Sequence, residues 1–249
     1  SVGGYAAYSS YRMSKIPGLS FRDALDDTLA GSGDAVITVG IVQNNQASYT
    51  VYGKDARELP AEEHTYEIGS LTKTFTAALV EKGIEEGKIR LDDTADLYLD
   101  LPEKNSCPTV RRLLTHTSGY KAYYFESPMI GNFLNGRNDF CGVSKDRVLN
   151  RLSRLSVGNE DHAFCYSNFG YATLGLVLES VYGEEYAALM NRFVQEDLGL
   201  QGTRISDGNG DLRNYWDWHD GDAYLAAGAL TSNTVSYTHL RAHETREDL

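Results

Sequence analysis

One serine and one lysine are spaced so that they could act together in nucleophilic catalysis. Ser70 and Lys73 stand at the start of a predicted helix, where positions i and i+3 share one face. A serine hydroxyl is a weak nucleophile without a base. Lysine normally has a pKa of about 10.4, but burial and the positive end of a helix dipole favour its neutral form. Lys73 could then accept the Ser70 proton, and the Ser70 N–H would face the developing oxyanion.

The same spacing occurs twice, so the pattern alone does not identify a site. Ser118 and Lys121 also form Ser-x-x-Lys, but Gly119 follows Ser118 directly and indicates the end of a helix rather than its start. On the pattern alone, the favoured interpretation is structural, with Ser70 as a helix N-cap and Lys73 as a surface cation.

A second segment could move protons and contact a substrate. Tyr166-Ser167-Asn168 is the only Tyr-x-Asn sequence in a chain with 17 tyrosines, and it precedes a predicted helix. A tyrosine hydroxyl can relay a proton when cations stabilise its phenolate, and an asparagine amide can orient a carbonyl and hydrogen-bond a lysine. The alternative is again structural, with Tyr166 in the core and Asn168 as the N-cap of the helix.

The elements around these segments indicate an α+β domain. Two strand patterns within residues 36–52 flank Asn44-Asn45, which predicts a hairpin. Ser20 followed by Asp23 predicts a capped helix before it. Helical patterns then dominate, and they cover residues 71–84, 109–115, 145–155, 168–181 and 184–196.

Composition and charge exclude several classes of protein. The 249 residues include 23 Lys and Arg against 35 Asp and Glu, a formal net charge of −12 that argues against a nucleic-acid surface. No apolar run of about 18 residues predicts a membrane span, and no secretory signal pattern opens the chain at Ser1. The cysteines match no zinc-ligand spacing and are interpreted as small buried apolar residues; they are Cys107, Cys141 and Cys165.

Four blocks, taken in order, resemble the penicillin-binding serine hydrolase family, which includes class C β-lactamases, D-alanyl-D-alanine carboxypeptidases and related esterases. The blocks are 68–73 (Ile-Gly-Ser-Leu-Thr-Lys), 112–119 (Arg-Leu-Leu-Thr-His-Thr-Ser-Gly), 166–171 (Tyr-Ser-Asn-Phe-Gly-Tyr) and 226–232 (Ala-Ala-Gly-Ala-Leu-Thr-Ser). Residues 85–93 between the first two blocks are also typical of the family. Four ordered blocks are far more specific than one motif, and the resemblance extends over roughly residues 20–234.

The resemblance implies a fold and a role for each matching residue. The fold is the β-lactamase/transpeptidase type, an antiparallel sheet flanked by helices with a mostly helical region beside it. Ser70 would be the acylated nucleophile, and Lys73 and Tyr166 the proton-transfer pair. Asn168 would contact the substrate, while His116 is typical of the family but structural. No metal and no cofactor are implied.

The later sequence departs from the family pattern. The family's third motif, Lys-Thr-Gly or His-x-Gly on a late strand, is not found; His219-Asp220-Gly221 fits formally but precedes the fourth block, so we reject it. We find no strand pattern after residue 225, and residues 235–249 resemble a translated sequencing adapter. We therefore expect a linker or tail at 1–19, a C-terminally truncated domain at 20–234 with its late sheet strands missing, and an artefactual tail at 235–249.

The resulting hypothesis is a serine hydrolase that forms an acyl-enzyme from amide, lactam or ester substrates, with peptidoglycan-type peptides or β-lactams favoured. We expect the fragment itself to be inactive. The rival hypothesis is a non-catalytic, penicillin-binding-like sensor or binding module. The resemblance also implies a small-molecule or peptide partner and an extracytoplasmic location, and the net charge of −12 argues against a nucleic-acid partner. Any membrane anchor would lie in sequence upstream of Ser1.

Overall fold

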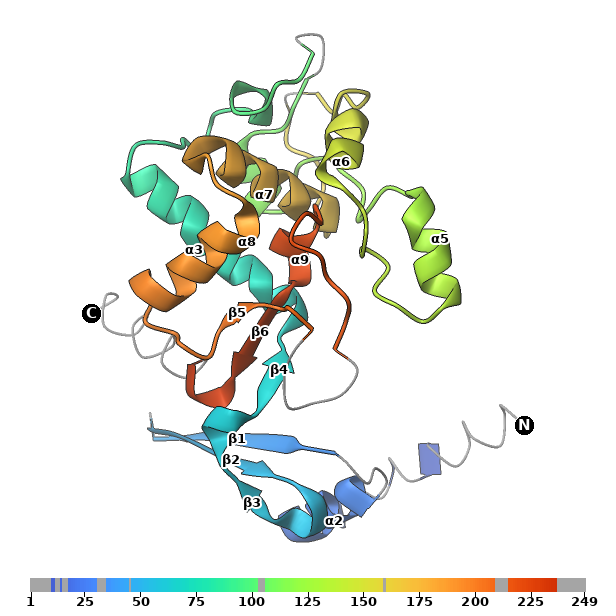
Figure 1. Ribbon diagram of the computed structural model, residues 1–249, viewed down its shortest axis with the longest axis vertical. Helices are drawn as coiled ribbons and strands as arrows, with labels where there is room; N and C mark the ends of the chain where they lie inside the picture. Colours follow the sequence, from blue (N-terminus) through green and yellow to red (C-terminus); the bar gives the residue numbers. More distant parts are fainter. Residues whose placement is uncertain are drawn as a thin grey trace. The chain divides into compact units, whose positions relative to one another are not determined.

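The chain folds into two compact units, Ser1–Ala61 and Glu62–Leu249 (Figure 1). The computed structural model describes residues 10–11, 14, 18–30, 35–44, 46–102, 106–158, 160–208 and 215–236. No helix among these residues is both long enough and apolar enough to cross a membrane. Most of the predicted tails at 1–19 and 235–249 therefore lie outside the described residues.

The first unit is a small antiparallel sheet with one helix. Its elements are α2 (Phe21–Ala30), β1 (Ile37–Gln43), β2 (Gln46–Tyr52), a 3₁₀ turn (Lys54–Ala56) and β3 (Glu58–Leu59), with strand order β1-β2-β3. The predicted hairpin is confirmed: Gln43 pairs with Gln46, and Asn44 has a φ of 51°. Asparagine tolerates this left-handed conformation in tight turns.

The predicted capped helix in this unit is also confirmed. The Ser20 hydroxyl oxygen accepts a hydrogen bond from the Asp23 N–H at 3.2 Å, and the hydroxyl donates to the Asp23 carboxylate at 2.6 Å. The helix then buries Leu25 and Leu29 against Ala56 of the same unit. A local cap and a short apolar stripe are therefore enough to place α2.

The second unit contains a sheet none of whose three strands was predicted from the sequence. β4 (Thr65–Glu67), β5 (Arg204–Ile205) and β6 (Leu230–Asn233) form an antiparallel sheet in the order β4-β6-β5. The expectation of no strand after residue 225 was therefore wrong. All four residues of β6 are buried, so the strand shows no alternation of apolar and polar residues.

Helices are the main regular elements of the second unit. They are α3 (Thr72–Glu85), α4 (Val110–Leu114), α5 (Ser127–Leu134), α6 (Lys145–Leu152), α7 (Asn168–Tyr182), α8 (Tyr186–Arg192) with a π-helical continuation (Phe193–Asp197), and α9 (Leu225–Gly228). Three short 3₁₀ turns accompany them, Ala61–Glu63, Gly69–Leu71 and Ala95–Leu97. The five helices predicted for this unit are confirmed, whereas α5 and α9 were not predicted.

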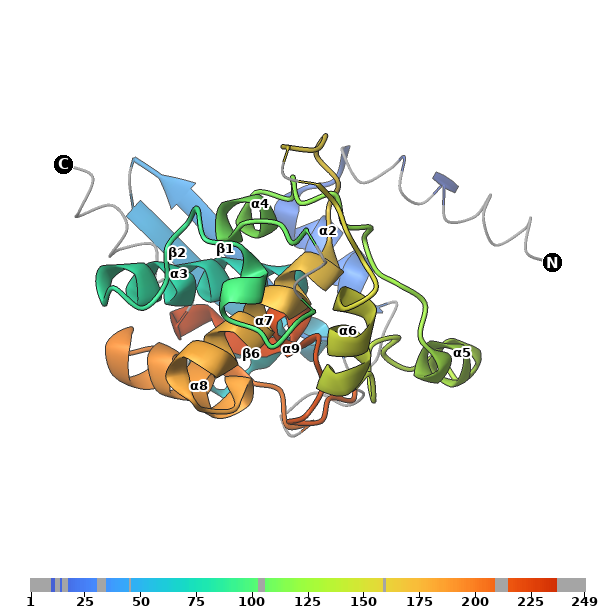
Figure 2. The same ribbon diagram turned by 90° about the horizontal axis from the view of Figure 1, so that it is seen from above.

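Helix α7 is the centre of the hydrophobic core. It contacts α3, α4, α6, α8 and α9, and Figure 2 shows it among them. Its residues from Phe169 to Leu178 are all buried, as expected for a helix that is apolar on every side. Gly175 allows close approach to α9, because a Cβ there would lie 2.9 Å from the Cβ of Ala226.

A buried threonine joins three helices of this core. The Thr76 hydroxyl on α3 lies 2.8 Å from the Tyr186 hydroxyl on α8 and 2.8 Å from the Ala226 carbonyl oxygen on α9. Thr76 is fully buried, so these groups have no access to water as an alternative partner. This contact fixes α9 against α3, which matters for the site described below.

We predict that Thr76→Val lowers the free energy of unfolding by about 1–3 kcal/mol, because it leaves buried polar groups without their partner. Thr74→Val is the matched control: Thr74 lies on the same helix, but its side chain is exposed and bonds only the Leu71 carbonyl oxygen. That variant should change stability by about 0.5 kcal/mol or less. Urea unfolding followed by circular dichroism measures both, and equal losses would contradict the assignment.

Candidate active site

Ser70 and Lys73 meet as the i, i+3 spacing predicts. Ser70 is exposed in the 3₁₀ turn that precedes α3, and Lys73 is 6% exposed on the first turn of that helix. Lys73 Nζ lies 3.3 Å from Ser70 Oγ. The N-cap of α3 is Leu71, so neither structural alternative holds: Ser70 is not the N-cap and Lys73 is not a surface cation.

The surroundings of Lys73 favour its neutral form. Nζ donates a hydrogen bond to the Ala227 carbonyl oxygen at 2.6 Å and lies 4.8 Å from the centre of the Tyr166 ring. Burial lowers the pKa of Lys73, and its interactions with Tyr166 oppose the shift only in part. A lysine with a lowered pKa can serve as a base near neutral pH.

The fourth sequence block, residues 226–232, holds the start of α3 in place. Leu230 at the start of β6 donates its N–H to the Thr72 hydroxyl oxygen and accepts the Ile68 N–H, both at 3.0 Å. Ala227, three residues earlier, supplies the acceptor for Lys73. The block therefore fixes the backbone on both sides of Ser70.

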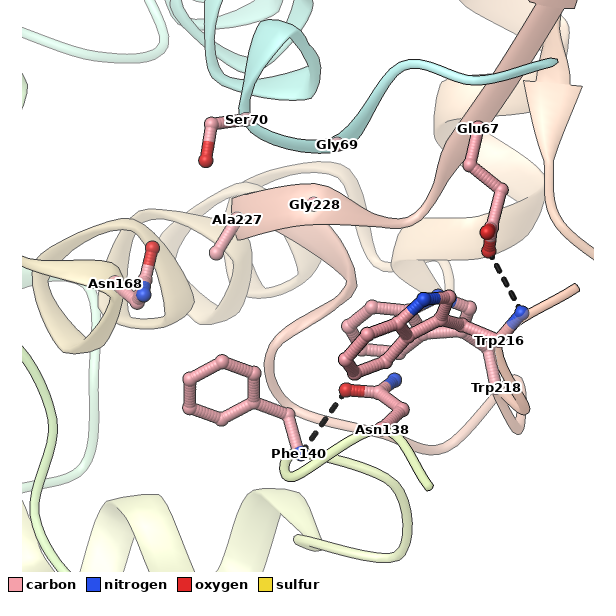
Figure 3. Close-up of a pocket in the computed structure, with 10 residues that line it drawn as sticks. All are labelled: Glu67, Gly69, Ser70, Asn138, Phe140, Asn168, Trp216, Trp218, Ala227 and Gly228. Atoms are coloured by element: carbon pink, nitrogen blue, oxygen red, sulfur yellow. Dashed lines mark hydrogen bonds between the residues drawn. The ribbon is translucent and has the colours of Figure 1, made fainter. Parts of the chain in front are cut away.

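The Tyr-x-Asn segment lies beside Lys73 at the start of α7. Tyr166 is 41% exposed and so is not a core residue. The N-cap of α7 is Ser167, whose hydroxyl oxygen accepts the Gly170 N–H at 2.9 Å while its hydroxyl donates to the Lys121 carbonyl oxygen. Asn168 is therefore not the cap, and its side chain is left to line the pocket with Ser70 (Figure 3).

His116 connects the second and third sequence blocks. Its Nδ1 accepts the Ser167 N–H at 3.1 Å, and its ring centre lies 4.6 Å from that of Tyr166. Burial and the nearby charge of Lys73 lower the pKa of His116. This shift favours the neutral ring, the form that can accept a hydrogen bond at Nδ1. The position agrees with the structural role expected for this residue.

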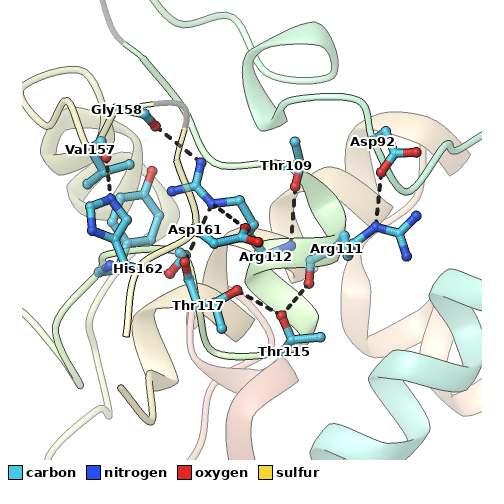
Figure 4. Close-up of polar contacts among 12 residues, drawn as sticks. Asp92, Thr109, Arg111, Arg112, Thr115, Thr117, Val157, Gly158, Asp161 and His162 are labelled. Carbon is cyan, nitrogen blue, oxygen red and sulfur yellow. Dashed lines mark hydrogen bonds and ion pairs between the residues drawn. The ribbon is translucent and has the colours of Figure 1, made fainter. Parts of the chain in front are cut away.

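A buried arginine supports the turn that carries His116 (Figure 4). Arg112 is 4% exposed and donates to the carbonyl oxygens of Thr117 at 3.4 Å and Gly158 at 3.1 Å. Asp161 lies 3.7 Å from its Nε. The neighbouring Arg111 instead forms an exposed pair with Asp92 at 2.9 Å.

The other Ser-x-x-Lys sequence forms no comparable site. Ser118 is 1% exposed, and its hydroxyl oxygen accepts the Tyr120 N–H. The lysine of that pair, Lys121, is exposed. The rejected His-x-Gly sequence is also apart from Ser70, because none of residues 219–221 lines the pocket.

A cavity of about 420 Å³ opens beside Ser70. Figure 3 shows Ser70 and Asn168 at one end, with Trp216 and Trp218 side by side at the other. The Glu67 carboxylate accepts the Trp216 N–H at 2.8 Å, and burial raises the pKa of this carboxyl group. The residues lining the cavity are Glu67, Gly69, Ser70, Asn138, Phe140, Asn168, Trp216, Trp218, Ala227 and Gly228.

Sequence reasoning missed the far wall of this cavity. Asn138, Phe140, Trp216 and Trp218 come from two loops that show no helical or strand pattern. The only signal was that both tryptophans of the chain, Trp216 and Trp218, lie within three consecutive residues of an acidic loop.

The cysteine prediction was right for two residues and wrong for the third. Cys107 and Cys141 are buried, but Cys165 is exposed, and all three are free thiols. Cys165 immediately precedes Tyr166, and its backbone N–H bonds the His116 carbonyl oxygen at 2.9 Å. The exposure of the Cys165 thiol therefore follows from the path of the backbone beside the site and not from the hydrophobicity of the side chain.

Comparison with known proteins gives consistent matches. The family model described as Beta-lactamase matches residues 16–246. A β-lactamase of Pseudomonas fluorescens is 28% identical over 84% of this chain and 60% of that protein. Two solved structures share the fold. A β-lactamase/D-alanine carboxypeptidase from Yersinia pestis complexed with citrate matches with a TM-score of 0.63 and 21% identity over 86% of this chain and 64% of that chain. An octameric penicillin-binding protein homologue from Pyrococcus abyssi matches with a TM-score of 0.68 and 22% identity over 95% of this chain and 57% of that chain. The chain thus spans less than two thirds of the length of these relatives.

Two adjacent arginines allow a matched test of the support for His116. We predict that Arg112→Met lowers the free energy of unfolding by about 1–3 kcal/mol, because it removes donors from carbonyl groups that are partly buried. Arg111→Met removes only an exposed ion pair and should cost about 1 kcal/mol or less. Chemical denaturation of both variants measures the difference, and a larger loss for Arg111→Met would refute it.

Proposed function

This chain belongs to the Beta-lactamase family, and from that premise we propose that it is a serine hydrolase that forms an acyl-enzyme on Ser70. The observation that carries the proposal is the buried Lys73 amine, 3.3 Å from Ser70 Oγ at the end of an open cavity. The proposed substrates are amides, lactams or esters, with β-lactams and peptidoglycan-type peptides favoured.

The proposed first step is acylation of Ser70. Neutral Lys73 keeps its hydrogen bond to the Ala227 carbonyl oxygen and accepts the Ser70 hydroxyl proton on its lone pair. Ser70 Oγ bonds to the substrate carbonyl carbon, and the Ser70 N–H stabilises the oxyanion that forms. When the carbon–nitrogen or carbon–oxygen bond breaks, the proton passes from Lys73 through Tyr166 to the leaving group.

The proposed second step returns the enzyme to its starting state. A water molecule loses a proton to the Lys73–Tyr166 pair and attacks the acyl carbon, and Ser70 Oγ leaves and recovers a proton. Asn168 would hold the acyl group by an amide hydrogen bond, since its side chain lines the cavity next to Ser70. No metal or cofactor takes part in either step.

The far wall of the cavity bears on the substrate. Phe140, Trp216 and Trp218 offer flat apolar surfaces to whatever is attached to the reacting carbonyl. Aromatic walls of this kind bind apolar or aromatic groups well, because they bury large areas and stack on planar groups. We propose a small molecule or short peptide as the substrate, and an extracytoplasmic location such as the resemblance implies.

We predict that a fluorophosphonate or a labelled penicillin modifies Ser70. Intact-mass analysis of the chain should show one adduct, which Ser70→Ala abolishes, because within the part of the chain that the structure describes we assign no other activated serine hydroxyl. Ser118→Ala is the control from the second Ser-x-x-Lys sequence, and it should leave labelling intact. An adduct that survives Ser70→Ala would overturn the assignment of the nucleophile.

The proton-transfer pair should appear in the pH dependence of acylation. The lowered pKa of Lys73 means that its active, neutral form is lost as pH falls, so the acylation rate should rise with pH and level off above that pKa. Lys73→Met should reduce the rate by about 10²-fold or more, and Tyr166→Phe should slow the steps that move a proton. Stopped-flow acylation with a chromogenic ester measures these rates. If both variants kept near-normal rates while Ser70→Ala was inactive, another base would be required.

Turnover separates the proposed enzyme from the rival sensor or binding module. For residues 1–249 we expect slow acylation of Ser70 and no sustained turnover, because the Ser70 N–H is the one oxyanion donor that we assign among the described residues. Loss of one such donor costs roughly 10²–10³ in rate. Hydrolysis of nitrocefin and of p-nitrophenyl esters measures turnover. Sustained Ser70-dependent turnover would refute the expectation of weak activity, whereas reversible binding with no Ser70 adduct would favour the sensor.

A further inference from the structure

The two loops that form the far wall of the cavity also bring three potential metal ligands together. Cys141 comes from the segment that carries Phe140, and His219 and Asp222 come from the segment that carries Trp218. Their ligand atoms all lie within 4.8 Å of one another. Such a set combines a thiol, an imidazole and a carboxylate, which are the three side-chain groups that bind zinc.

The two loops are already held in register without any ion. The Asp222 carboxylate accepts the Gly142 N–H at 2.9 Å and the His219 N–H at 3.0 Å. The Ala223 N–H donates to the Val143 carbonyl oxygen at 2.9 Å. Backbone contacts on both sides of the cluster therefore hold the two loops together before any ion binds.

The geometry distinguishes an ion site from a catalytic triad. Cys141 Sγ lies 3.9 Å from His219 Nδ1, and Asp222 Oδ1 lies 3.8 Å from the same nitrogen. In a triad the nucleophile and the acid contact opposite nitrogens of the histidine, because the ring passes a proton between them. Here both partners approach one nitrogen, so the three donors converge on a common point.

Two of the three side chains are shielded from water. Cys141 is 8% exposed and Asp222 is 4% exposed. A divalent cation between a thiol and a carboxylate in such surroundings binds the thiol as thiolate and offsets the negative charge of both ligands.

We propose that Cys141, His219 and Asp222 bind one divalent transition-metal ion, with Zn²⁺ the best match and water as its fourth ligand. Ligand atoms around tetrahedral zinc lie roughly 3.3–3.6 Å apart. The two separations at His219 Nδ1, 3.9 and 3.8 Å, would therefore contract by about half an ångström or less. The Cys141–Asp222 separation, which is within 4.8 Å, would contract by up to about 1.3 Å. A thiolate and an imidazole select Zn²⁺ over Mg²⁺ or Ca²⁺, which prefer oxygen ligands. Binding releases the thiol proton to solvent.

The ion would stabilise the far wall of the cavity and take no part in the chemistry at Ser70. Phe140 precedes Cys141 directly, and Trp218 precedes His219 directly. Both aromatic residues line the cavity (Figure 3). An ion that joins the two loops would therefore hold these rings in one arrangement, as structural zinc does when it links segments distant in sequence.

Metal titration of the reduced, chelator-treated chain tests the proposal. Co²⁺ should bind with 1:1 stoichiometry and give a thiolate-to-cobalt charge-transfer band, and Zn²⁺ should displace it. His219→Ala should weaken binding of both ions by 10-fold or more; its side chain is 69% exposed, so the fold should persist. Cys141→Ser should abolish the band, while Cys165→Ser, which alters the exposed thiol, should leave it unchanged.

Tryptophan fluorescence gives a second readout that does not depend on activity. Zn²⁺ should change the emission of the unmodified chain and of Ser70→Ala to the same extent. At the lowest Zn²⁺ concentration that saturates the unmodified chain, the change in His219→Ala should be much smaller, because its affinity is weaker. Failure of Ser70 labelling would leave this result untouched, so the two proposals can fail separately. No 1:1 binding, a charge-transfer band that persists in Cys141→Ser, or equal Zn²⁺ affinity in His219→Ala would each overturn the site.

Discussion

The burial of one lysine amine is the constraint on which the rest of the site depends. A buried lysine is costly unless its amine finds a hydrogen-bond acceptor, and Lys73 finds the Ala227 carbonyl oxygen 154 residues later in the chain. That contact requires α9 to lie against the start of α3. The two hydrogen bonds of Leu230 then bring β6 alongside β4. Neighbouring contacts of one segment, residues 227–233, therefore hold the amine of Lys73, the proposed base, and form the small sheet.

Polar groups at the other side of the site extend this arrangement. Arg112 is buried so that it can hold two loop carbonyl groups, and those loops carry the turn at His116. His116 in turn accepts the N–H of Ser167, the residue that caps α7. Tyr166 and Asn168 flank that cap, so their placement follows from the end of a buried helix. Groups on rigid elements are held more precisely than groups on loops.

The two ends of the cavity are built differently. The end with Ser70 and Asn168 lies at the starts of two core helices, while the aromatic end is carried by loops. Loops are the parts of a fold that change most readily without loss of stability. In the proposed enzyme, the reacting groups would lie on helices and the substrate would contact loops, so the substrate could change while the chemistry stays. Asp222, which bonds both loops, is the protein's own means of holding the far wall of the cavity.

The sequence by itself determined the features that depend on neighbouring residues. These include the hairpin at Asn44, the cap at Ser20, the five helices of periodic pattern and the meeting of Ser70 with Lys73, since each is set within one or two turns of chain. Only the tertiary structure decided the rest. β6 has four buried residues and no alternation, so its pairing partners define it as a strand. The acceptor for Lys73, the aromatic wall and the cluster at Cys141 arise from segments some 80 to 150 residues apart, and such contacts leave no periodic signal because they form only when separate elements pack together.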